Sequence, residues 1–499
     1  MSESAALATI NPATIAAFVI YLVVILAIAV VAWSRTRDGG DYFLGGRSLS
    51  PTVAAISAAA SDMSGWLLLG LPGFAYLAGL ESIWIALGLV VGVALNWRLV
   101  AARLRTYSAQ LDDAVTVPAY LARRFNGHSK LLQPFSAAII LLFFLFYVSA
   151  GLIGGGKLFN TVFGIDYQLA VLLGALVILL YTLFGGFLAV SWSDLFQGLL
   201  MIAALIAVPA MVLVGGGDSP QRELTPELLN PFTSASGEAL GWLAIASSLA
   251  WGLGYFGQPH ILSRFMAIRS ADEVKIATRI GVFWSFLGLA AAIAVGISGY
   301  QYFAEPTYQP LADPEQAFVA LTNALFSPLL AGILLAAILA AIMSTVDSQL
   351  LVSSAALAED LYPQLRQWLT PGKAESEQER MWVARIAVVG LAAIATLLAL
   401  NPESSVLGVV SYAWAGLGAG IGPVVILSLY WRRMTAAGAL AGLIAGSATV
   451  LVWGNLRGGW FDLYELLPAF VVAVIAIVAV SLASEQGECD SRLADLNNS

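Results

Sequence analysis

One acidic residue stands in the middle of a long apolar run near the start of the chain. The run extends from Pro51 to Gly73 and carries Asp62 at its centre. An ionised carboxylate at mid-membrane costs about 3 kcal/mol on insertion scales, so it needs a compensating partner. Residues that loosen or break a helix surround it, namely Ser57, Ser61, Ser64, Gly65 and Pro72. They predict an interrupted helix, whose freed carbonyls are tolerable only when buried or coordinated.

A bound sodium ion satisfies both the carboxylate and the freed carbonyls, because this hard cation takes oxygen ligands. A purely structural explanation is also open. In that explanation Asp62 caps a helix or pairs with an arginine near the inner surface, and the small residues only pack helices together.

A second group of oxygen-bearing side chains lies between Ala341 and Gln349. Ser344 and Ser348 are four residues apart and share one helical face, with Thr345 beside them. Their hydroxyls are able to complete an oxygen shell around a cation. The alternative is that each hydroxyl bonds to the backbone of its own helix, as is common in membranes.

The run from Trp251 to His260 contains three glycines and Pro259, which predict a second break. Aromatic rings beside unwound backbone suit a small zwitterion, although glycine packing and an aromatic belt explain the same residues. Two interrupted segments in corresponding positions indicate a transport site between inverted repeats.

The composition requires lipid around most of the chain. Hydrophobic residues make up 59% of the 499 residues and charged ones 11%, against about 25% in soluble domains. The sequence has no basic stripe for nucleic acid, no Cys/His cluster for a cofactor or redox metal, and no nucleophile–base pattern for an enzyme. The single cysteine is Cys489, and the two histidines, His128 and His260, are predicted in loops.

Apolar runs of about 20 residues predict an all-α polytopic protein with about thirteen transmembrane helices. They begin near Ala13, Pro51, Ile83, Leu131, Tyr167, Leu195, Ala239, Val282, Pro328, Val383, Val406, Ala436 and Leu463. The first is a retained helix, not a cleaved signal. Residues 1–484 form one transmembrane domain, and 485–499 a short polar cytoplasmic tail. The distribution of basic residues predicts that the N-terminus lies outside and the C-terminus inside. With this orientation only three of the 23 basic residues fall outside, namely Lys157, Arg222 and Arg457. Arg264 is counted among the inner ones.

Five motifs resemble the proline branch of the sodium:solute symporter family. They are Tyr42 to Pro51, Ser61 to Trp66, Trp251 to His260, Met343 to Thr345 with Gln349 to Leu351, and Val410 to Gly416 onward. The resemblance covers nearly the whole chain except its C-terminal tail. It implies sodium-coupled uptake of L-proline by alternating access across the cytoplasmic (inner) membrane of a bacterium. It also implies a leucine-transporter-type core of two inverted five-helix repeats in helices two to eleven, about residues 51–431.

The same resemblance assigns roles by position. The sodium ligands would be the carbonyls of Ala60, Met63 and Ala341 and the hydroxyls of Ser344 and Thr345, with Asp62 tied to sodium binding. Proline would lie near Ser64, Trp66, Tyr147, Trp251, Tyr255 and Pro259. Arg47 matches a residue of inner-side coupling, and Asp194 an acid on the sodium exit route. Beyond sodium, L-proline and the bilayer, the resemblance implies no cofactor and no obligate protein partner.

Asp347 and Ser348 depart from the best-known carrier of this branch, which has two small uncharged residues there. We expect Asp347 to be a hydrated surface residue near the inner mouth; the alternative is a second cation step, which leaves the stoichiometry open. Rival functions are symport of another solute, such as pantothenate, a carboxylate or another amino acid; proton coupling through Asp62; and a sensor that does not transport.

Overall fold

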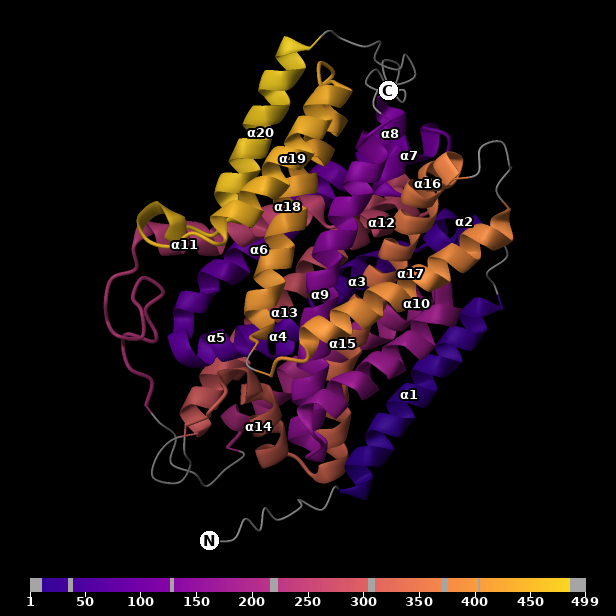
Figure 1. The fold of residues 1–499 in the computed structure, drawn as a ribbon. Helices are drawn as coiled ribbons and strands as arrows, with labels where there is room; N and C mark the ends of the chain where they lie inside the picture. Colours follow the sequence, from indigo (N-terminus) through magenta and orange to yellow (C-terminus); the bar gives the residue numbers. More distant parts are fainter. Residues whose placement is uncertain are drawn as a thin grey trace.

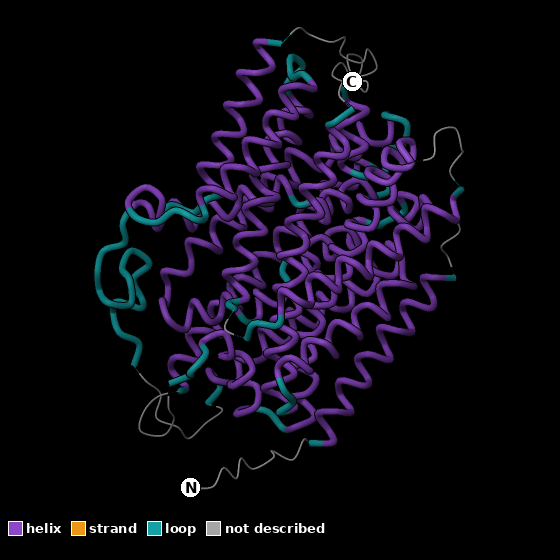
Figure 2. Tube along the Cα trace, in the orientation of Figure 1, coloured by secondary structure: helices purple, strands orange, loops and turns teal. Residues whose placement is uncertain are grey.

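The computed structural model describes residues 11–34, 39–125, 130–215, 223–303, 310–369, 376–402 and 404–484. Every regular element in these ranges is an α-helix or a short 3-10 or π segment, which confirms the all-α prediction (Figure 2). His128, Cys489 and the predicted tail at 485–499 lie outside the described residues.

Figure 1 labels the helices in chain order. They are α1 (Pro12–Trp33), α2 (Gly39–Leu44), α3 (Pro51–Asp62), α4 (Gly65–Leu68), α5 (Gly70–Ala78), α6 (Ile83–Asn96), α7 (Ala102–Gln110), α8 (Val117–Arg124), α9 (Leu132–Phe163), α10 (Tyr167–Leu213), α11 (Trp242–Ala250), α12 (Pro259–Ala267), α13 (Val274–Tyr302), α14 (Ala317–Leu325), α15 (Pro328–Ala355), α16 (Tyr362–Leu369), α17 (Glu377–Ala399), α18 (Val406–Tyr430), α19 (Ala436–Trp453) and α20 (Leu466–Ala483).

Several helices begin where a capping residue specifies the start. Ser50 accepts from the Val53 amide and precedes Pro51, the first residue of α3. Ser405 and Thr435 cap α18 and α19 in the same way. Side-chain oxygens at these positions satisfy amides that a helix start leaves free, and proline there needs no amide partner. Local chemistry therefore fixes the starts that were predicted at Pro51, Val406 and Ala436.

Ten helices among the described residues are long and apolar enough to cross a membrane. This finding confirms a multi-span protein, whereas the count of thirteen stays a prediction. The segments predicted from Tyr167 and Leu195 form one element, α10, bent at Gly186 where φ is 63° and ψ is −177°. α13 begins at Val274, earlier than the predicted Val282. The prediction followed the apolar run and therefore missed the first turns, which carry charged residues that face away from the core.

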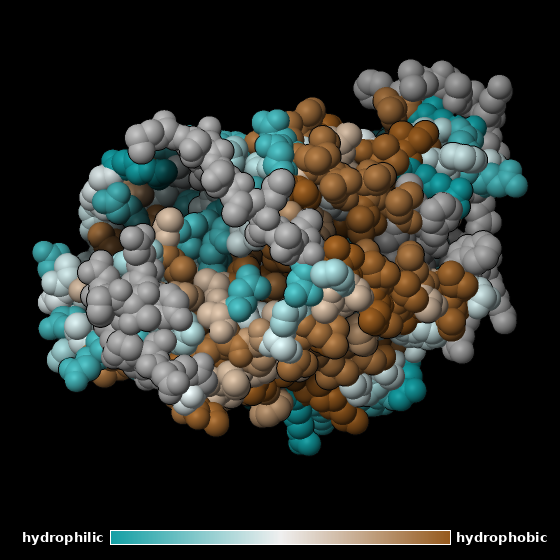
Figure 3. All heavy atoms as spheres, turned by 90° about the horizontal axis from the view of Figure 1, so that it is seen from below, coloured by the Kyte–Doolittle hydropathy of each residue, from teal (hydrophilic) through white to brown (hydrophobic). Residues whose placement is uncertain are grey.

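The outer surface matches a lipid environment. Large apolar side chains are exposed on α1, α13 and α17, including Ile20, Phe283 and Leu397. Figure 3 shows apolar side chains covering much of one face, with polar ones gathered toward its edges. Helices α3, α9, α15 and α18 are far more buried and form the centre, while α1 packs against α10 and α15.

The close approach of α6 to the 3-10 segment Trp251–Gly257 depends on three glycines. A Cβ built on Gly92 would lie 2.3 Å from the carbonyl oxygen of Gly252, and one on Gly252 would lie 2.1 Å from that of Gly88. Such distances are far below van der Waals contact, so only glycine fits at these positions. The backbone of α6 therefore rests directly on the unwound segment.

Candidate functional site

The first predicted break is present. α3 ends at Asp62, Met63 leaves the helical region with φ −83° and ψ 69°, and Ser64 is extended with ψ −162°. The Ser64 hydroxyl then accepts from the Trp66 amide and caps α4, which starts at Gly65. The regular helical hydrogen bonding is thus interrupted deep inside the protein, where Met63 has no exposed surface.

The second predicted break is also present. α11 ends at Ala250, and a 3-10 segment from Trp251 to Gly257 follows. Gln258 is extended, with ψ 106°, before α12 starts at Pro259. The Gln258 side-chain amide donates to the carbonyl of Gly254 at 3.1 Å, so part of the freed backbone is satisfied within the protein.

Four of the predicted sodium ligands lie together where α15 crosses the end of α3. The Ser344 hydroxyl contacts the carbonyl oxygens of Ala60 at 2.9 Å and Ala341 at 3.1 Å. The Thr345 hydroxyl contacts the Ala341 carbonyl, also at 3.1 Å. We call these four residues the α15 oxygen cluster. Bonding to their own helix, the simpler explanation for these hydroxyls, occurs as well, but Ser344 also reaches another helix.

The Asp62 side chain faces a different place from this cluster. Its Oδ2 accepts from the Tyr255 hydroxyl at 2.5 Å. Asp62 lines a small cavity together with Asn96 and Ser285, and no residue of the α15 oxygen cluster lines it. None of the ion pairs formed by the described residues includes Asp62, so pairing with an arginine does not account for it.

Aromatic residues predicted for the substrate surround the first break. Tyr147 and Trp66 both donate to the carbonyl of Asp62, at 3.2 and 3.3 Å. The rings of Trp66 and Trp251 lie 6.2 Å apart, which joins the two breaks. Pro259 opens α12 directly after the second break. The two breaks and the aromatic residues therefore form one buried region.

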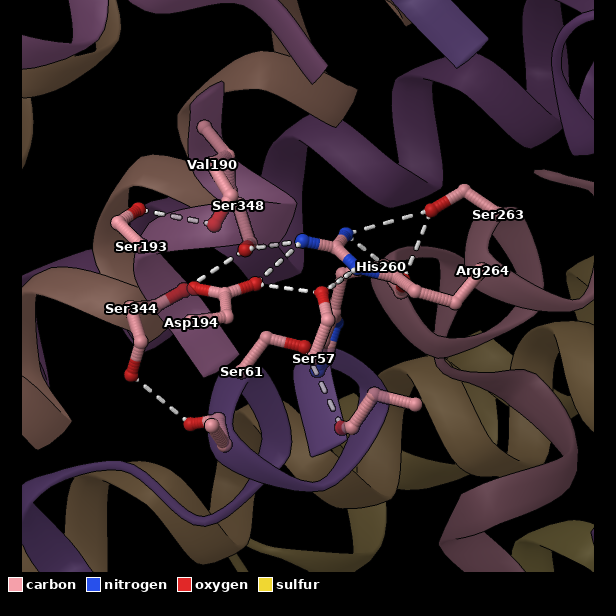
Figure 4. Close-up of polar contacts among 12 residues, drawn as sticks. Ser57, Ser61, Val190, Ser193, Asp194, His260, Ser263, Arg264, Ser344 and Ser348 are labelled. Carbon is pink, nitrogen blue, oxygen red and sulfur yellow. Dashed lines mark hydrogen bonds and ion pairs between the residues drawn. The ribbon is translucent and has the colours of Figure 1, made fainter. Parts of the chain in front are cut away.

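Arg264 is the centre of a buried polar network that the sequence did not reveal (Figure 4). Its guanidinium forms an ion pair with Asp194 at 3.1 Å, and neither side chain has exposed surface. It also donates to Ser348 at 2.6 Å and to Ser57 at 3.0 Å, while Ser57 donates to Asp194. The network joins α12, α10, α15 and α3, and it places the predicted exit-route acid beside a fixed cation.

Three positions differ from the sequence-based expectations. Asp347 has no exposed surface, and neither carboxylate oxygen has a hydrogen-bond partner in the part of the chain that the structure describes, so the expected hydrated position is wrong. Arg264, counted above as an inner loop cation, lies inside α12. His260, predicted in a loop, is the second residue of the same helix and is also fully buried.

Arg47 ties three segments together at the end of the molecule opposite the start of α1. It pairs with Asp113 at 2.6 Å and donates to the carbonyls of Met266 at 2.7 Å and Ala114 at 2.9 Å. Arg47 itself adopts φ 51°, which is uncommon for a residue with a side chain. The Arg47 side chain therefore links the end of α12 to the loop after α7.

A second ionic tie joins α9 to the start of α18. Lys157 contacts Asp313 at 3.1 Å and Glu315 at 2.7 Å. Glu315 in turn accepts from the Ser405 hydroxyl and from the amides of Val406 and Leu407. A carboxylate at a helix N-terminus is stabilised by the free amides and the helix dipole.

The model of the sodium:solute symporter family matches residues 42–446. The chain belongs to this family. Among its relatives is the high-affinity proline transporter of Bacillus subtilis, 47% identical over 92% of this chain and 96% of the relative. The sodium/proline symporter of Escherichia coli K12 is also 47% identical, over 93% of this chain and 92% of the relative.

Solved structures show the fold of this sodium:solute symporter family member. A sodium-coupled sialic acid symporter superposes with a TM-score of 0.78 at 20% identity, covering 96% of this chain and all of the other. A transporter of the nucleobase-cation-symport-1 family superposes with a TM-score of 0.55 at 15% identity, covering 91% of this chain and 97% of the other. The predicted leucine-transporter-type fold is confirmed, and the family is one of transporters and not of enzymes.

Proposed function

We propose that this family member takes up L-proline together with sodium across the cytoplasmic membrane. Curated relatives named for proline transport are 45–47% identical over nearly the whole chain, which supports the substrate. Two helix breaks beside buried aromatic rings supply peptide dipoles for the charges of an amino acid and an apolar surface for its ring. The bilayer is the only further partner in this proposal.

The contact between Ser344 and Ala60 is the observation that carries the coupling mechanism. It joins the broken helix to α15 through the oxygens assigned to sodium, those of the α15 oxygen cluster together with the Met63 carbonyl. A sodium ion bound there would replace this single hydrogen bond with coordination by several oxygens, while the hydroxyls keep their protons. The end of α3 is then held more firmly, and its orientation decides the shape of the substrate region.

Proline would contact the residues that the two breaks bring together. They are Ser64, Trp66, Tyr147, Trp251, Tyr255 and Pro259. Sodium bound to the neighbouring oxygens orders this region and so tightens proline binding. By linkage, proline tightens sodium by the same factor.

The remaining assignments concern release and orientation. Arg47 holds the end of α12 closed until the repeats rock, and Asp194 receives the departing sodium once Arg264 moves away from it. The N-terminus lies outside and the C-terminus inside. An inward-negative potential then drives each transported charge by about 2.3 kcal/mol per 100 mV.

The deciding experiment is uptake of labelled proline into proteoliposomes with and without an inward sodium gradient. We expect accumulation only with sodium, and inhibition by excess unlabelled proline. Accumulation driven equally by a proton gradient would reject sodium coupling. Displacement of the label by pantothenate or a short carboxylate at lower concentration than proline would reject the substrate. Binding of proline without uptake would identify a sensor.

A further inference from the structure

A small cavity beside the first helix break is lined by polar residues from three helices. They are Asp62 at the end of α3, Asn96 at the end of α6 and Ser285 in α13, with Tyr255 of the second break beside them. The other lining residues are apolar, and the space is about that of one water molecule. Asn96 and Ser285 belong to none of the sequence motifs described above.

Three oxygens at this cavity have no hydrogen-bond partner among the described residues. They are Oδ1 of Asp62, Oδ1 of Asn96 and Oγ of Ser285, and each of these residues is about 1% exposed. Buried polar atoms in folded proteins almost always have a partner, so three such oxygens around one cavity point to a binding site.

The orientation of these oxygens is fixed by the opposite ends of their side chains. The Asn96 amide nitrogen donates to the Tyr255 carbonyl at 2.9 Å, which leaves its oxygen for the cavity. The Tyr255 hydroxyl donates to Oδ2 of Asp62 at 2.5 Å, which leaves Oδ1. The site therefore offers a carboxylate oxygen, an amide oxygen and a hydroxyl, and two of these groups can only accept.

The charge at this place selects the ligand. Asp62 forms none of the ion pairs found among the described residues, and a buried ionised carboxylate without a counter-charge costs several kcal/mol. A water molecule fills the space but brings no charge. A divalent ion commonly binds more than one carboxylate, whereas this cavity offers only that of Asp62. A bare monovalent cation matches the size, the hard oxygen donors and the single negative charge.

We propose that Asp62, Asn96 and Ser285 bind a second sodium ion, separate from the one assigned to the α15 oxygen cluster. The two ions would lie on either side of the same helix break, one held toward α15 and the other toward α6 and α13. This inference extends the proposed sodium coupling, but it concerns ion binding alone and needs no assumption about the solute.

The test counts sodium ions bound to the purified full-length protein in detergent, without proline. Equilibrium binding of radiolabelled sodium should give more than one ion per molecule. Ser285→Cys keeps the side-chain size but offers sulfur, a soft ligand that sodium disfavours. We expect Ser285→Cys to lower the affinity for one of the two ions about tenfold or more, the equivalent of about 1.4 kcal/mol. Asn96→Ala should have the same effect.

A matched control and a second measurement make the result decisive. Ser298→Cys alters another buried serine of α13 that does not line the cavity, and it should leave both ions unchanged. Thr345→Ala should weaken the other ion. Thermal unfolding without sodium identifies any variant that is merely misfolded.

A count of one bound sodium ion per wild-type molecule at saturation overturns the proposal. The cavity would then hold water, or Asp62 would hold a proton. An ion count and affinity unchanged in Ser285→Cys overturns it as well. A single bound ion together with sodium-driven proline uptake rejects only the second site. Absence of any bound sodium rejects the proposed function too.

Discussion

The hydroxyl of Ser344 in α15 lies 2.9 Å from the carbonyl oxygen of Ala60 in the last turn of α3. The two residues are far apart in the sequence, and the contact crosses the interface between the broken helix and its unbroken neighbour. Oxygens from both helices are therefore adjacent before any ion is considered. A ligand bound between them necessarily couples the two helices.

Loss of the Asp62 carboxylate should abolish most sodium-driven uptake. Asp62→Cys removes the buried charge and its contact with Tyr255, so we expect the uptake rate to fall about tenfold or more at unchanged expression. Initial rates of labelled proline uptake in proteoliposomes measure the effect. Asp272→Asn, at an exposed position before α13, is the control. Near-normal uptake with an unchanged sodium requirement would show that Asp62 takes no part in sodium binding.

Thr345→Ala should raise the sodium requirement more than it changes the binding of proline. The substitution removes one oxygen of the α15 oxygen cluster, so half-maximal uptake should need about tenfold more sodium. Thr396→Ala serves as the control, since this threonine of α17 is also buried and also bonds to its own helix, at Ala392. If the proline KM at saturating sodium moves most instead, Thr345 belongs to the substrate region.

Removal of Arg264 should destabilise the fold, because it leaves Asp194 as an unpaired charge with no exposed surface. For Arg264→Met we expect a loss of about 3–5 kcal/mol, seen as a lower unfolding temperature in detergent. Adding Asp194→Asn should restore much of that stability without restoring transport. Arg269→Met breaks an exposed pair with Glu273 and should have little effect. Equal losses of stability in Arg264→Met and Arg269→Met would mean that the buried ion pair does not stabilise the fold.

Glu315→Gln should loosen the start of α18. The side chain keeps its size but loses the charge that Lys157 and the amides of Val406 and Leu407 share. Hydrogen exchange in this first turn should accelerate on the order of tenfold, as expected for one charged hydrogen bond. The first turn of α19, capped by Thr435, is an internal control. Unchanged exchange at Val406 would show that Glu315 contributes nothing to this helix start.

The sequence identified the features that depend on local chemistry. Both helix breaks were predicted from glycine, serine and proline, and the structure has them next to Asp62 and at Trp251–Gly257. The helix starts at Pro51, Val406 and Ala436, each preceded by a capping serine or threonine, were placed correctly. Such signals lie within a few residues of the structure they determine, so they are readable without knowledge of the fold.

Features that depend on distant contacts were not readable. Asp194 and Arg264 pair across 70 sequence positions, and no local pattern joins them. Asp347 looked like the end of a helix, but α15 continues through a π segment, Ala356–Leu361, into α16 and carries Asp347 into the interior. Asn96 drew no prediction from the sequence. The signal available for it was an amide side chain at the end of an otherwise apolar run.

The glycine contact between α6 and the second break has a mechanical consequence. Gly92 and Gly252 meet backbone to backbone, with no side chain between them. Because the two backbones are in direct contact, we expect a tilt of the second break in the proposed transport cycle to be transmitted to α6, although α6 follows the first break in the chain. The moving part of the molecule would then include elements of both repeats.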